Sequence, residues 1–200
     1  MNLHALSKER LSFLVVDQSE AVRQLLEAVL TPVKNRIILA DNVDDGLEYA
    51  RTLWPDVIIA DYAIDGSGAQ FCKNVRSDPM LSHTPFILMS AFANQVNPVK
   101  YLESGCDQVV YKPFKCTDMY VAIRSSIQHT AVNGRGSMIP VLYKAGHCDY
   151  VSPEHLEKMI EEKEILCFRR SDGVVILGRD PIRDSQFEGY EGPERRWAVA

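Results

Sequence analysis

The sequence has no long hydrophobic run, and its first residues do not form a secretion signal. It contains no stretch of about 18 apolar residues, the length that a helix needs to cross a bilayer. The N-terminal segment MNLHALSKERLSF carries charges where a signal peptide has its apolar core. We therefore expect a cytoplasmic protein without contact to a membrane.

The sequence also lacks paired cysteines and an excess of positive charge. The five cysteines form no Cys-x-x-Cys pair, which argues against a zinc site or a disulfide framework and favours reduced, buried thiols. The 22 Lys and Arg residues are outnumbered by 27 Asp and Glu residues, for a net charge of −5. A broad nucleic-acid surface needs the opposite balance, so nucleic-acid binding is disfavoured.

Short apolar runs alternate with helical patterns over the first 130 residues. We predict strands at 12–17, 36–40, 56–61, 85–90 and 107–111, and helices at 20–30, 43–53, 69–77, 98–105 and 117–128. This alternation predicts an α/β fold with a doubly wound, five-stranded parallel sheet in the flavodoxin-like order 2-1-3-4-5. We expect residues 1–130 to form this domain and residues 131–200 to form a small α+β extension.

Four polar side chains lie at the predicted C-terminal ends of strands. They are Asp17, Asp61, Ser90 and Lys112. Taken singly, a strand-end Asp often caps a helix, a Ser often forms a turn, and a Lys is often solvated. In a flavodoxin-like sheet, however, these strand ends share one edge, where ligands bind. The spacing therefore predicts a functional site that holds two carboxylates, a hydroxyl and an ammonium group.

Four segments resemble the receiver domains of bacterial two-component response regulators. They are FLVVDQSEAVRQLL, DVIIADYAIDGSGAQFC, FILMSAFA and VVYKPF, and the resemblance covers residues 10–130. It implies that a histidine kinase or phosphotransfer protein transfers a phosphoryl group to Asp61. Ser90 and Lys112 would then contact the phosphoryl group, and the Lys112–Pro113 peptide bond would be cis.

The same resemblance implies a Mg²⁺ site. Its ligands would be Asp17, Asp61 and the backbone carbonyl of Ala63. Gln18 stands where the family usually has a second acid, and Mg²⁺ favours carboxylate oxygens, so Gln18 is a doubtful ligand and we expect weak Mg²⁺ binding. Val109 likewise stands where the family often has an aromatic residue that moves with the Ser or Thr, and Asp65 where it often has Pro.

The predicted extension begins with a linker at 132–137 and a strand at 138–144. A helix follows, with Ser152 as its N-cap and Pro153 at its first position. Residues 165–170 and 174–179 then predict a β-hairpin with a turn that contains Gly173. Residues 146–148 (GHC) with His155 lack the spacing of a metal site.

An isolated hairpin is marginal in water, and this extension carries more apolar side chains than a hairpin hides. These side chains are Phe168, Val174, Ile176 and Trp197. We predict that the extension docks on the first domain or on a second copy of it. The expected surface is the exposed face of the fourth and fifth helices, built around Val99, Lys100, Tyr120 and Arg124.

Three functions remain open. In the first, the chain is a phosphorylation-controlled switch that signals through protein contacts, with an unknown output protein and a possible homodimer. Alternatively, it is a pseudo-receiver that binds partners without phosphorylation because of Gln18. Less favoured is a DNA-binding regulator, based on a faint likeness of the extension to small helix-turn-helix modules. An enzyme with its own turnover is not expected, because 200 residues leave no room for a separate catalytic domain.

Overall fold

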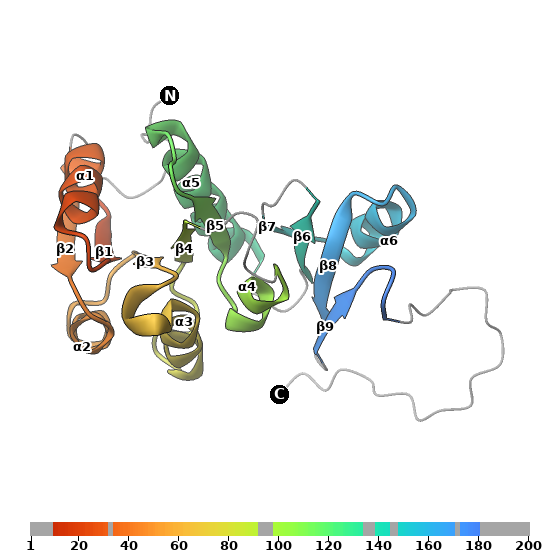
Figure 1. The fold of residues 1–200 in the computed structure, drawn as a ribbon, viewed down its shortest axis with the longest axis horizontal. Coiled ribbons are helices and arrows are strands. Elements are labelled where there is room, and N and C mark those ends of the chain that lie inside the picture. The colour runs from red at the N-terminus through yellow and green to blue at the C-terminus, as the bar shows by residue number, and fades with distance from the viewer. Residues whose placement is uncertain are drawn as a thin grey trace.

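A parallel five-stranded sheet forms the body of the protein, and an antiparallel sheet lies beside it (Figure 1). The computed structural model describes residues 10–31, 34–91, 98–133, 139–144, 148–170 and 173–180. The strands of the parallel sheet are β1 (Ser12–Val16), β2 (Arg36–Ala40), β3 (Val57–Asp61), β4 (Phe86–Ser90) and β5 (Gln108–Tyr111). Their order is β2-β1-β3-β4-β5, which confirms the predicted flavodoxin-like fold.

Helices cover both faces of the parallel sheet. They are α1 (Glu20–Leu30), α2 (Val43–Leu53), α3 (Gly68–Ser77), α4 (Pro98–Ser104) and α5 (Cys116–Asn133). In Figure 1, α1 and α5 lie above the sheet, and α2, α3 and α4 lie below it. A short 3₁₀ turn (Ile64–Gly66) connects β3 to α3.

The strands are apolar on both sides, as a sheet between two helical layers requires. Successive residues of β3 alternate between two cores: Ile58 packs toward α2, α3 and α4, and Ile59 packs toward α1 and α5. Both side chains are fully buried. Because the strand period is two residues, one apolar run supplies both cores.

The extension is an antiparallel sheet with one helix. Its strands β6 (Ile139–Tyr143), β7 (Cys148–Val151), β8 (Ile165–Arg170) and β9 (Gly173–Ile176) are ordered β7-β6-β8-β9. Helix α6 (Pro153–Glu161) begins at Ser152, whose hydroxyl accepts a bond from the backbone N–H of His155, as predicted. The predicted hairpin is present as β8 and β9, but it is half of a larger sheet, because β6 pairs with β8 and β7 pairs with β6.

The linker prediction was wrong at its start. Residues 132 and 133 belong to α5, because no glycine or proline interrupts that helix before Gly134, and residues 134–138 lie outside the described residues. Of the GHC segment, Cys148 begins β7, and residues 146–147 lie outside the described residues.

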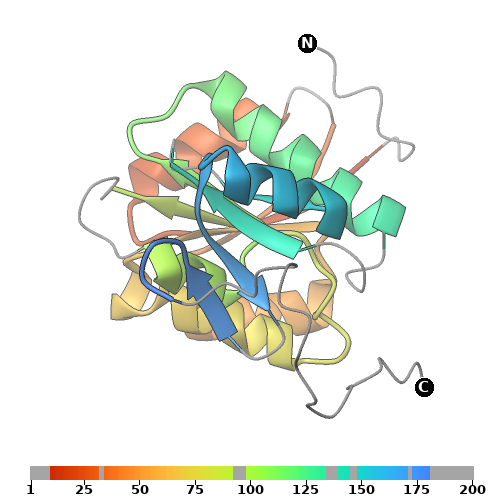
Figure 2. The ribbon, with the colours of Figure 1, turned by 90° about the vertical axis from the view of Figure 1, so that its right-hand side faces the viewer.

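The antiparallel sheet uses its two faces differently. One row of paired residues, Leu142, Cys167 and Ile176, joins the core that contains α4. The neighbouring row, Val141, Phe168 and Val175, packs against α6. Figure 2 shows α6 on one side of this sheet and α4 on the other. Both faces are therefore covered, which explains why these strands hold few polar residues.

The prediction that the extension docks on the receiver at α4 is confirmed, but the prediction that α5 shares this surface was wrong. Helix α4 packs against β6, β8 and β9, and β5 contacts β7. Tyr120 and Arg124 of α5 do not take part: the Tyr120 hydroxyl donates to the carbonyl of Val29 in α1, and Arg124 is exposed. Phe168 faces α6 instead of the receiver. Trp197 and the side chain of Val99 lie outside the described residues.

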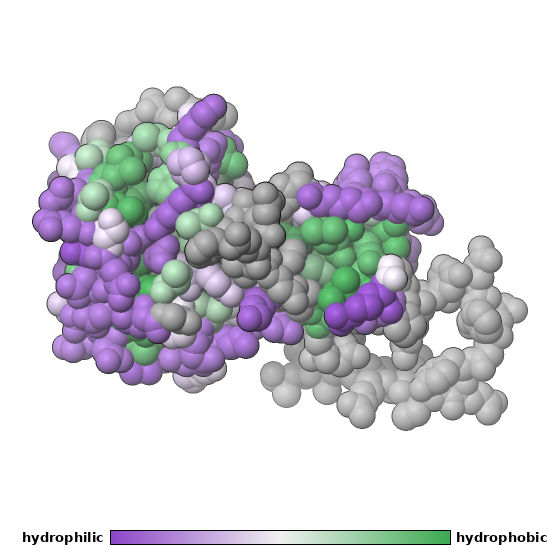
Figure 3. All heavy atoms as spheres, in the orientation of Figure 1, coloured by the Kyte–Doolittle hydropathy of each residue, from purple (hydrophilic) through white to green (hydrophobic). Residues whose placement is uncertain are grey.

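Hydrophobic side chains also gather on the outer surface over β8, below the hydrophilic surface of α6 (Figure 3). Among the residues that the structure describes, no helix is long and apolar enough to span a membrane.

Candidate functional site

The four predicted side chains lie at one edge of the parallel sheet. Asp17 follows β1, Asp61 ends β3, Ser90 ends β4 and Lys112 follows β5. Parallel strands bring these ends together although they are far apart in sequence. The backbone N–H of Lys112 donates to the carbonyl of Ser90 at 2.7 Å, which continues the strand pairing up to the site.

Lys112 holds the two carboxylates together. Its Nζ lies 2.7 Å from Oδ2 of Asp17 and 2.7 Å from Oδ1 of Asp61. The side chains of Asp17 and Asp61 are 4% and 16% exposed, so this ion pair is largely shielded from water. Burial acts to lower the pKa of the Lys112 ammonium, but the hydrogen bonds and charges of both carboxylates outweigh burial and raise it.

Backbone donors fix the remaining oxygens of both carboxylates. Oδ1 of Asp17 accepts from the N–H of Ser19 at 2.8 Å, and Oδ2 of Asp61 accepts from the N–H of Ala63 at 2.9 Å. The Lys112–Pro113 bond is cis, as the resemblance implies. The geometry thus presents a carboxylate of fixed orientation beside a fixed cation.

Ser90 has a partner that the sequence did not reveal. Its Oγ accepts a 3.0 Å hydrogen bond from the hydroxyl of Tyr101 in α4, and both side chains are buried. Val109, the position that the resemblance pointed to, is a buried core residue. The only sequence signal for Tyr101 was an aromatic residue on the apolar side of α4.

The side-chain amide of Gln18 contacts Asp65 in the turn after β3. Its Nε2 donates to Oδ1 of Asp65 at 2.8 Å, and Oδ2 of Asp65 accepts from the N–H of Val43 at 2.9 Å. Both Gln18 and Asp65 are exposed, and Asp65 has a left-handed backbone with φ of 48°. Gln18 and Asp65, two of the three residues that differ from the usual family pattern, therefore contact each other.

The model of the family named response regulator receiver domain matches residues 13–124. The chain belongs to the response regulator receiver family. The transcriptional regulatory protein AfsQ1 of Streptomyces coelicolor is 32% identical over 118 residues, 58% of this chain and 51% of that protein. The phosphate regulon transcriptional regulatory protein PhoB of Escherichia coli is 27% identical over 113 residues, 56% of this chain and 49% of that protein. The chain thus spans about half the length of these curated relatives.

Solved receiver structures share the fold. A putative response regulator from Chloroflexus aurantiacus superposes with a TM-score of 0.56 at 23% identity, covering 60% of this chain and 98% of that one. The chemotaxis response regulator CheY4 of Vibrio cholerae gives a TM-score of 0.53 at 24% identity, covering 58% of this chain and 98% of that one. At such low identity these structures support the fold alone.

Mg²⁺ binding is typical of this receiver family, and the residues fit the ion in part. Asp17 and Asp61 offer the oxygen ligands that Mg²⁺ prefers, and a common contact to Lys112 Nζ places them within reach of one small cation. Within the described ranges, however, no three Asp, Glu, His or Cys side chains converge in a way that could hold a metal. A cation here would depend on two carboxylates and neutral oxygens such as the Ala63 carbonyl.

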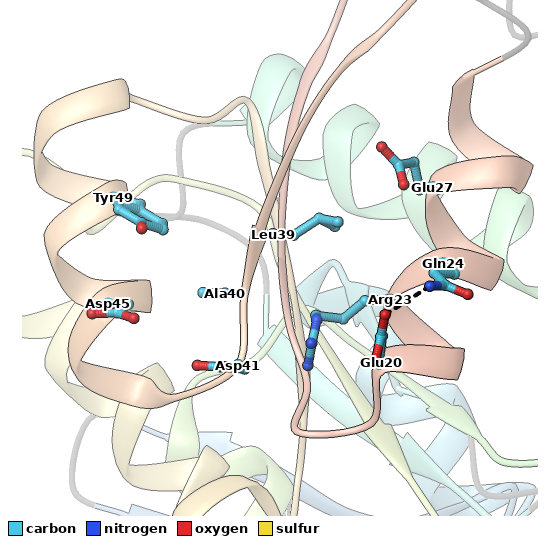
Figure 4. Close-up of a pocket in the computed structure, with 9 residues that line it drawn as sticks. All are labelled: Glu20, Arg23, Gln24, Glu27, Leu39, Ala40, Asp41, Asp45 and Tyr49. Carbon is cyan, nitrogen blue, oxygen red and sulfur yellow. Dashed lines mark hydrogen bonds between the residues drawn. The ribbon is translucent and has the colours of Figure 1, made fainter.

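A surface groove of about 400 Å³ lies elsewhere on the receiver, between α1, β2 and α2 (Figure 4). Its lining is mainly polar and acidic, and consists of Glu20, Arg23, Gln24, Glu27, Leu39, Ala40, Asp41, Asp45 and Tyr49. None of the four strand-end residues lines it. The groove therefore adds nothing to the site that the fold predicts.

Proposed function

We propose that the protein is a response regulator that accepts a phosphoryl group on Asp61 and signals through protein–protein contacts. The observation that carries this proposal is the position of Lys112 Nζ, at 2.7 Å from an oxygen of Asp17 and from an oxygen of Asp61. The carboxylate of Asp61 is oriented, partly exposed and adjacent to a cation, as a nucleophile toward phosphorus requires.

In the proposed reaction, an oxygen of Asp61 forms a bond to the phosphorus of a phosphohistidine. The bond from phosphorus to the histidine nitrogen breaks, and that nitrogen keeps the electron pair. Lys112 then pairs with a phosphoryl oxygen, and the Ser90 hydroxyl donates a hydrogen bond to another. Asp17, Asp61 and the Ala63 carbonyl would hold Mg²⁺, which supplies positive charge next to the phosphoryl oxygens.

The donor is proposed to be a histidine kinase or a phosphotransfer protein. We assign residues 1–130 to the receiver and residues 131–200 to an extension that contributes to the output. The two curated relatives are transcriptional regulators by name, but they match only 58% and 56% of this chain. In the described part of the extension, α6 is followed by strand β8 and not by a second helix, so a helix-turn-helix has no support there. The absence of nucleic-acid binding, a possible homodimer and a cytoplasmic location stay predictions.

Labelling by acetyl phosphate in the presence of Mg²⁺ tests the proposal. We expect a phosphoryl mass increase that maps to Asp61 and is absent in Asp61→Asn. Asp41→Asn is the matched control, because Asp41 follows β2 at the same sheet edge but is exposed and does not contact Lys112. Labelling that persists in Asp61→Asn, or fails in the unaltered protein at saturating Mg²⁺, overturns the proposal.

The second candidate is a pseudo-receiver that binds its partner without phosphorylation. It is favoured by the contact between Gln18 and Asp65, because Gln18 brings no charge to the carboxylate pair. This candidate predicts no labelling at any Mg²⁺ concentration and a partner affinity that Asp61→Asn leaves unchanged. The labelling experiment therefore separates the two functions.

A further inference from the structure

Apolar side chains stay half-buried at the border between α6 and the end of the antiparallel sheet. The buried cluster on this face of the sheet draws its members from the strands and from α6. Ile160 of α6, Val175 of β9 and Leu177 just after β9 pack against this cluster but remain partly exposed. Figure 3 shows hydrophobic surface beside the hydrophilic surface of α6. We call Ile160, Val175 and Leu177 together the α6–β9 surface.

The helix that borders this surface is acidic. Between residues 153 and 164 the exposed charged side chains are two lysines, Lys158 and Lys163, and five glutamates, Glu154, Glu157, Glu161, Glu162 and Glu164. Glu157 stands three residues before Ile160, so the two side chains are neighbours on the helix surface. The α6–β9 surface therefore suits a ligand that is both apolar and positively charged.

The chain turns back on itself at the end of β9. The backbone N–H groups of Arg179 and Asp180 both donate to the carbonyl of Ile176, at 3.2 and 2.9 Å, and the Asp180 carboxylate accepts from the N–H of Ile176 at 2.8 Å. Gly178 permits this turn, because its φ of 84° is unfavourable for other residues. The described part of the chain therefore ends beside Leu177 and the α6–β9 surface.

The segment that follows carries both kinds of group. Residues 181–200 lie outside the described residues, and their sequence places Arg195 and Arg196 directly before Trp197. An extended chain from Asp180 to Trp197 reaches about 60 Å, whereas α6 is only about 14 Å long. Covalent attachment also gives the segment a local concentration in about the millimolar range, which an external partner rarely attains.

We propose that residues 195–197 bind the α6–β9 surface of the same chain, with the ring of Trp197 on Val175 and Leu177 and an arginine beside Glu157. A second copy of the chain suits this surface less well, because a symmetric contact would bring two acidic α6 helices together. The proposal goes beyond phosphorylation and does not depend on it. An output partner that uses the α6–β9 surface must then displace residues 195–197.

Fluorine NMR of the full-length chain, labelled with 5-fluorotryptophan, tests the proposal. The chain has two tryptophans, so Trp54→Phe and Trp197→Phe assign the two signals. Exchange of H₂O for D₂O shifts the signal of a solvated fluorotryptophan and leaves that of a buried one in place. Trp54 is the internal reference, because its side chain is 51% exposed. We expect the solvent shift of Trp197 to be at most a third of the shift of Trp54.

Val175→Lys tests where Trp197 binds. The exchange replaces an apolar side chain of the α6–β9 surface with a charge that repels the arginines, and the solvent shift of Trp197 should rise to that of the free labelled amino acid. Val174→Lys is the matched control: it makes the same exchange on the neighbouring residue of β9, whose side chain packs against the cluster that contains α4. Its Trp197 signal should stay as in the unaltered protein. An unchanged Trp54 signal shows that either variant is folded.

Trp197→Ala gives an independent measurement, because it alters the terminal segment alone. We expect hydrogen exchange at residues 174–177 to become at least threefold faster in this variant. Equal exchange in the two proteins would overturn the proposal.

The other outcomes of the fluorine experiment overturn it as well. If Trp197 shifts as much as Trp54 in the unaltered protein, the segment is free and the surface is open to another protein. If Val174→Lys releases Trp197, or if folded Val175→Lys does not, Trp197 binds elsewhere. If Trp197 gains solvent shift on dilution, the occupant is the segment of a second copy. None of these results bears on labelling of Asp61, so the proposed function is tested separately.

Discussion

The phenol of Tyr150 in β7 donates a 2.9 Å hydrogen bond to Oδ1 of Asp107, the residue before β5. Asp107 is 2% exposed, and its Oδ2 lies 2.8 Å from Nη2 of Arg76 and accepts from the N–H of Phe86 at 2.6 Å. A buried carboxylate of the receiver is therefore shared by α3, β4 and the extension. This network fixes the extension by directional bonds in addition to apolar packing.

The first prediction is that Tyr150→Phe lowers the free energy of unfolding by about 2 kcal/mol, a typical value for one hydrogen bond to a charged group. Tyr143→Phe is the control, because its hydroxyl donates to Sδ of Met159, a weak acceptor, at 3.5 Å within the extension. Urea unfolding of the two variants measures the difference. If both variants lost the same free energy of unfolding, the hydrogen bond to Asp107 would stabilise the protein no more than the weak bond of Tyr143 does.

The parallel sheet was predictable from sequence, because each strand contains a continuous apolar run. In the third strand this run is residues 57–60, and an Asp stands on either side of it. The site followed from it, since strand order alone brings Asp17, Asp61, Ser90 and Lys112 to one edge. Strand β7 was not predictable: Cys148–Val151 is short, and its pairing with the predicted strand β6 leaves no signal in the sequence.

The partner of Ser90 was hidden for a related reason. Tyr101 reaches Ser90 from a different element, and its burial depends on the antiparallel sheet that covers α4. Likewise, the contact between Gln18 and Asp65 depends on the left-handed backbone of Asp65, which a non-glycine residue rarely adopts. Such contacts are set by tertiary packing and not by periodicity.

The second prediction concerns Gly68, the first residue of α3. A Cβ at this position would overlap the carbonyl oxygen of Asp61 and lie 2.9 Å from Cα of Tyr62, and these backbone atoms cannot move aside as a side chain can. We expect Gly68→Ala to cost about 3 kcal/mol of stability, the upper range for forced overpacking. Thermal and urea unfolding measure this loss.

Gly46→Ala is the control for Gly68→Ala. Its Cβ would meet only side-chain atoms, those of Val16 at 3.2 Å and Phe71 at 3.3 Å. Alanine in a helix interior gains about 1 kcal/mol over glycine, which offsets the close contact. We therefore expect a change within about 1 kcal/mol. Similar losses in both variants would contradict the importance of the close approach at Gly68.

The third prediction is that Lys112→Met destabilises the protein by about 3 kcal/mol near neutral pH, because it leaves two shielded carboxylates without their cation. The pKa of Lys112 is raised above its ordinary value of 10.5, so the folded state holds this proton more tightly than the unfolded state. The contribution is therefore complete below pH 10.5 and is lost as pH rises through the raised pKa.

The difference in unfolding free energy between the unaltered protein and Lys112→Met should thus stay constant from about pH 7 to about pH 9 and shrink above 10.5. Lys115→Met serves as the control, since Lys115 is exposed and should show no such dependence. A difference that grows with rising pH would mean that the folded state binds the Lys112 proton less tightly than the unfolded state does.

The last prediction is that Gln18→Asp tightens Mg²⁺ binding about tenfold, or about 1.4 kcal/mol. The exchange adds a full negative charge close to Asp17 and Asp61, and charge at short range strongly raises the affinity for a divalent cation. It also removes the amide that donates to Asp65, so two carboxylates face each other and the metal-free protein should lose about 0.5 kcal/mol of stability. Calorimetric titration with MgCl₂ measures the affinity, and unfolding without Mg²⁺ measures the stability.

Gln24→Asp is the matched control, because Gln24 lies on α1 and its amide also donates to a carboxylate, that of Glu20 at 2.9 Å. If Gln24→Asp gained as much affinity as Gln18→Asp, the effect would be one of net charge, and Gln18 would have no special place beside the proposed Mg²⁺ site.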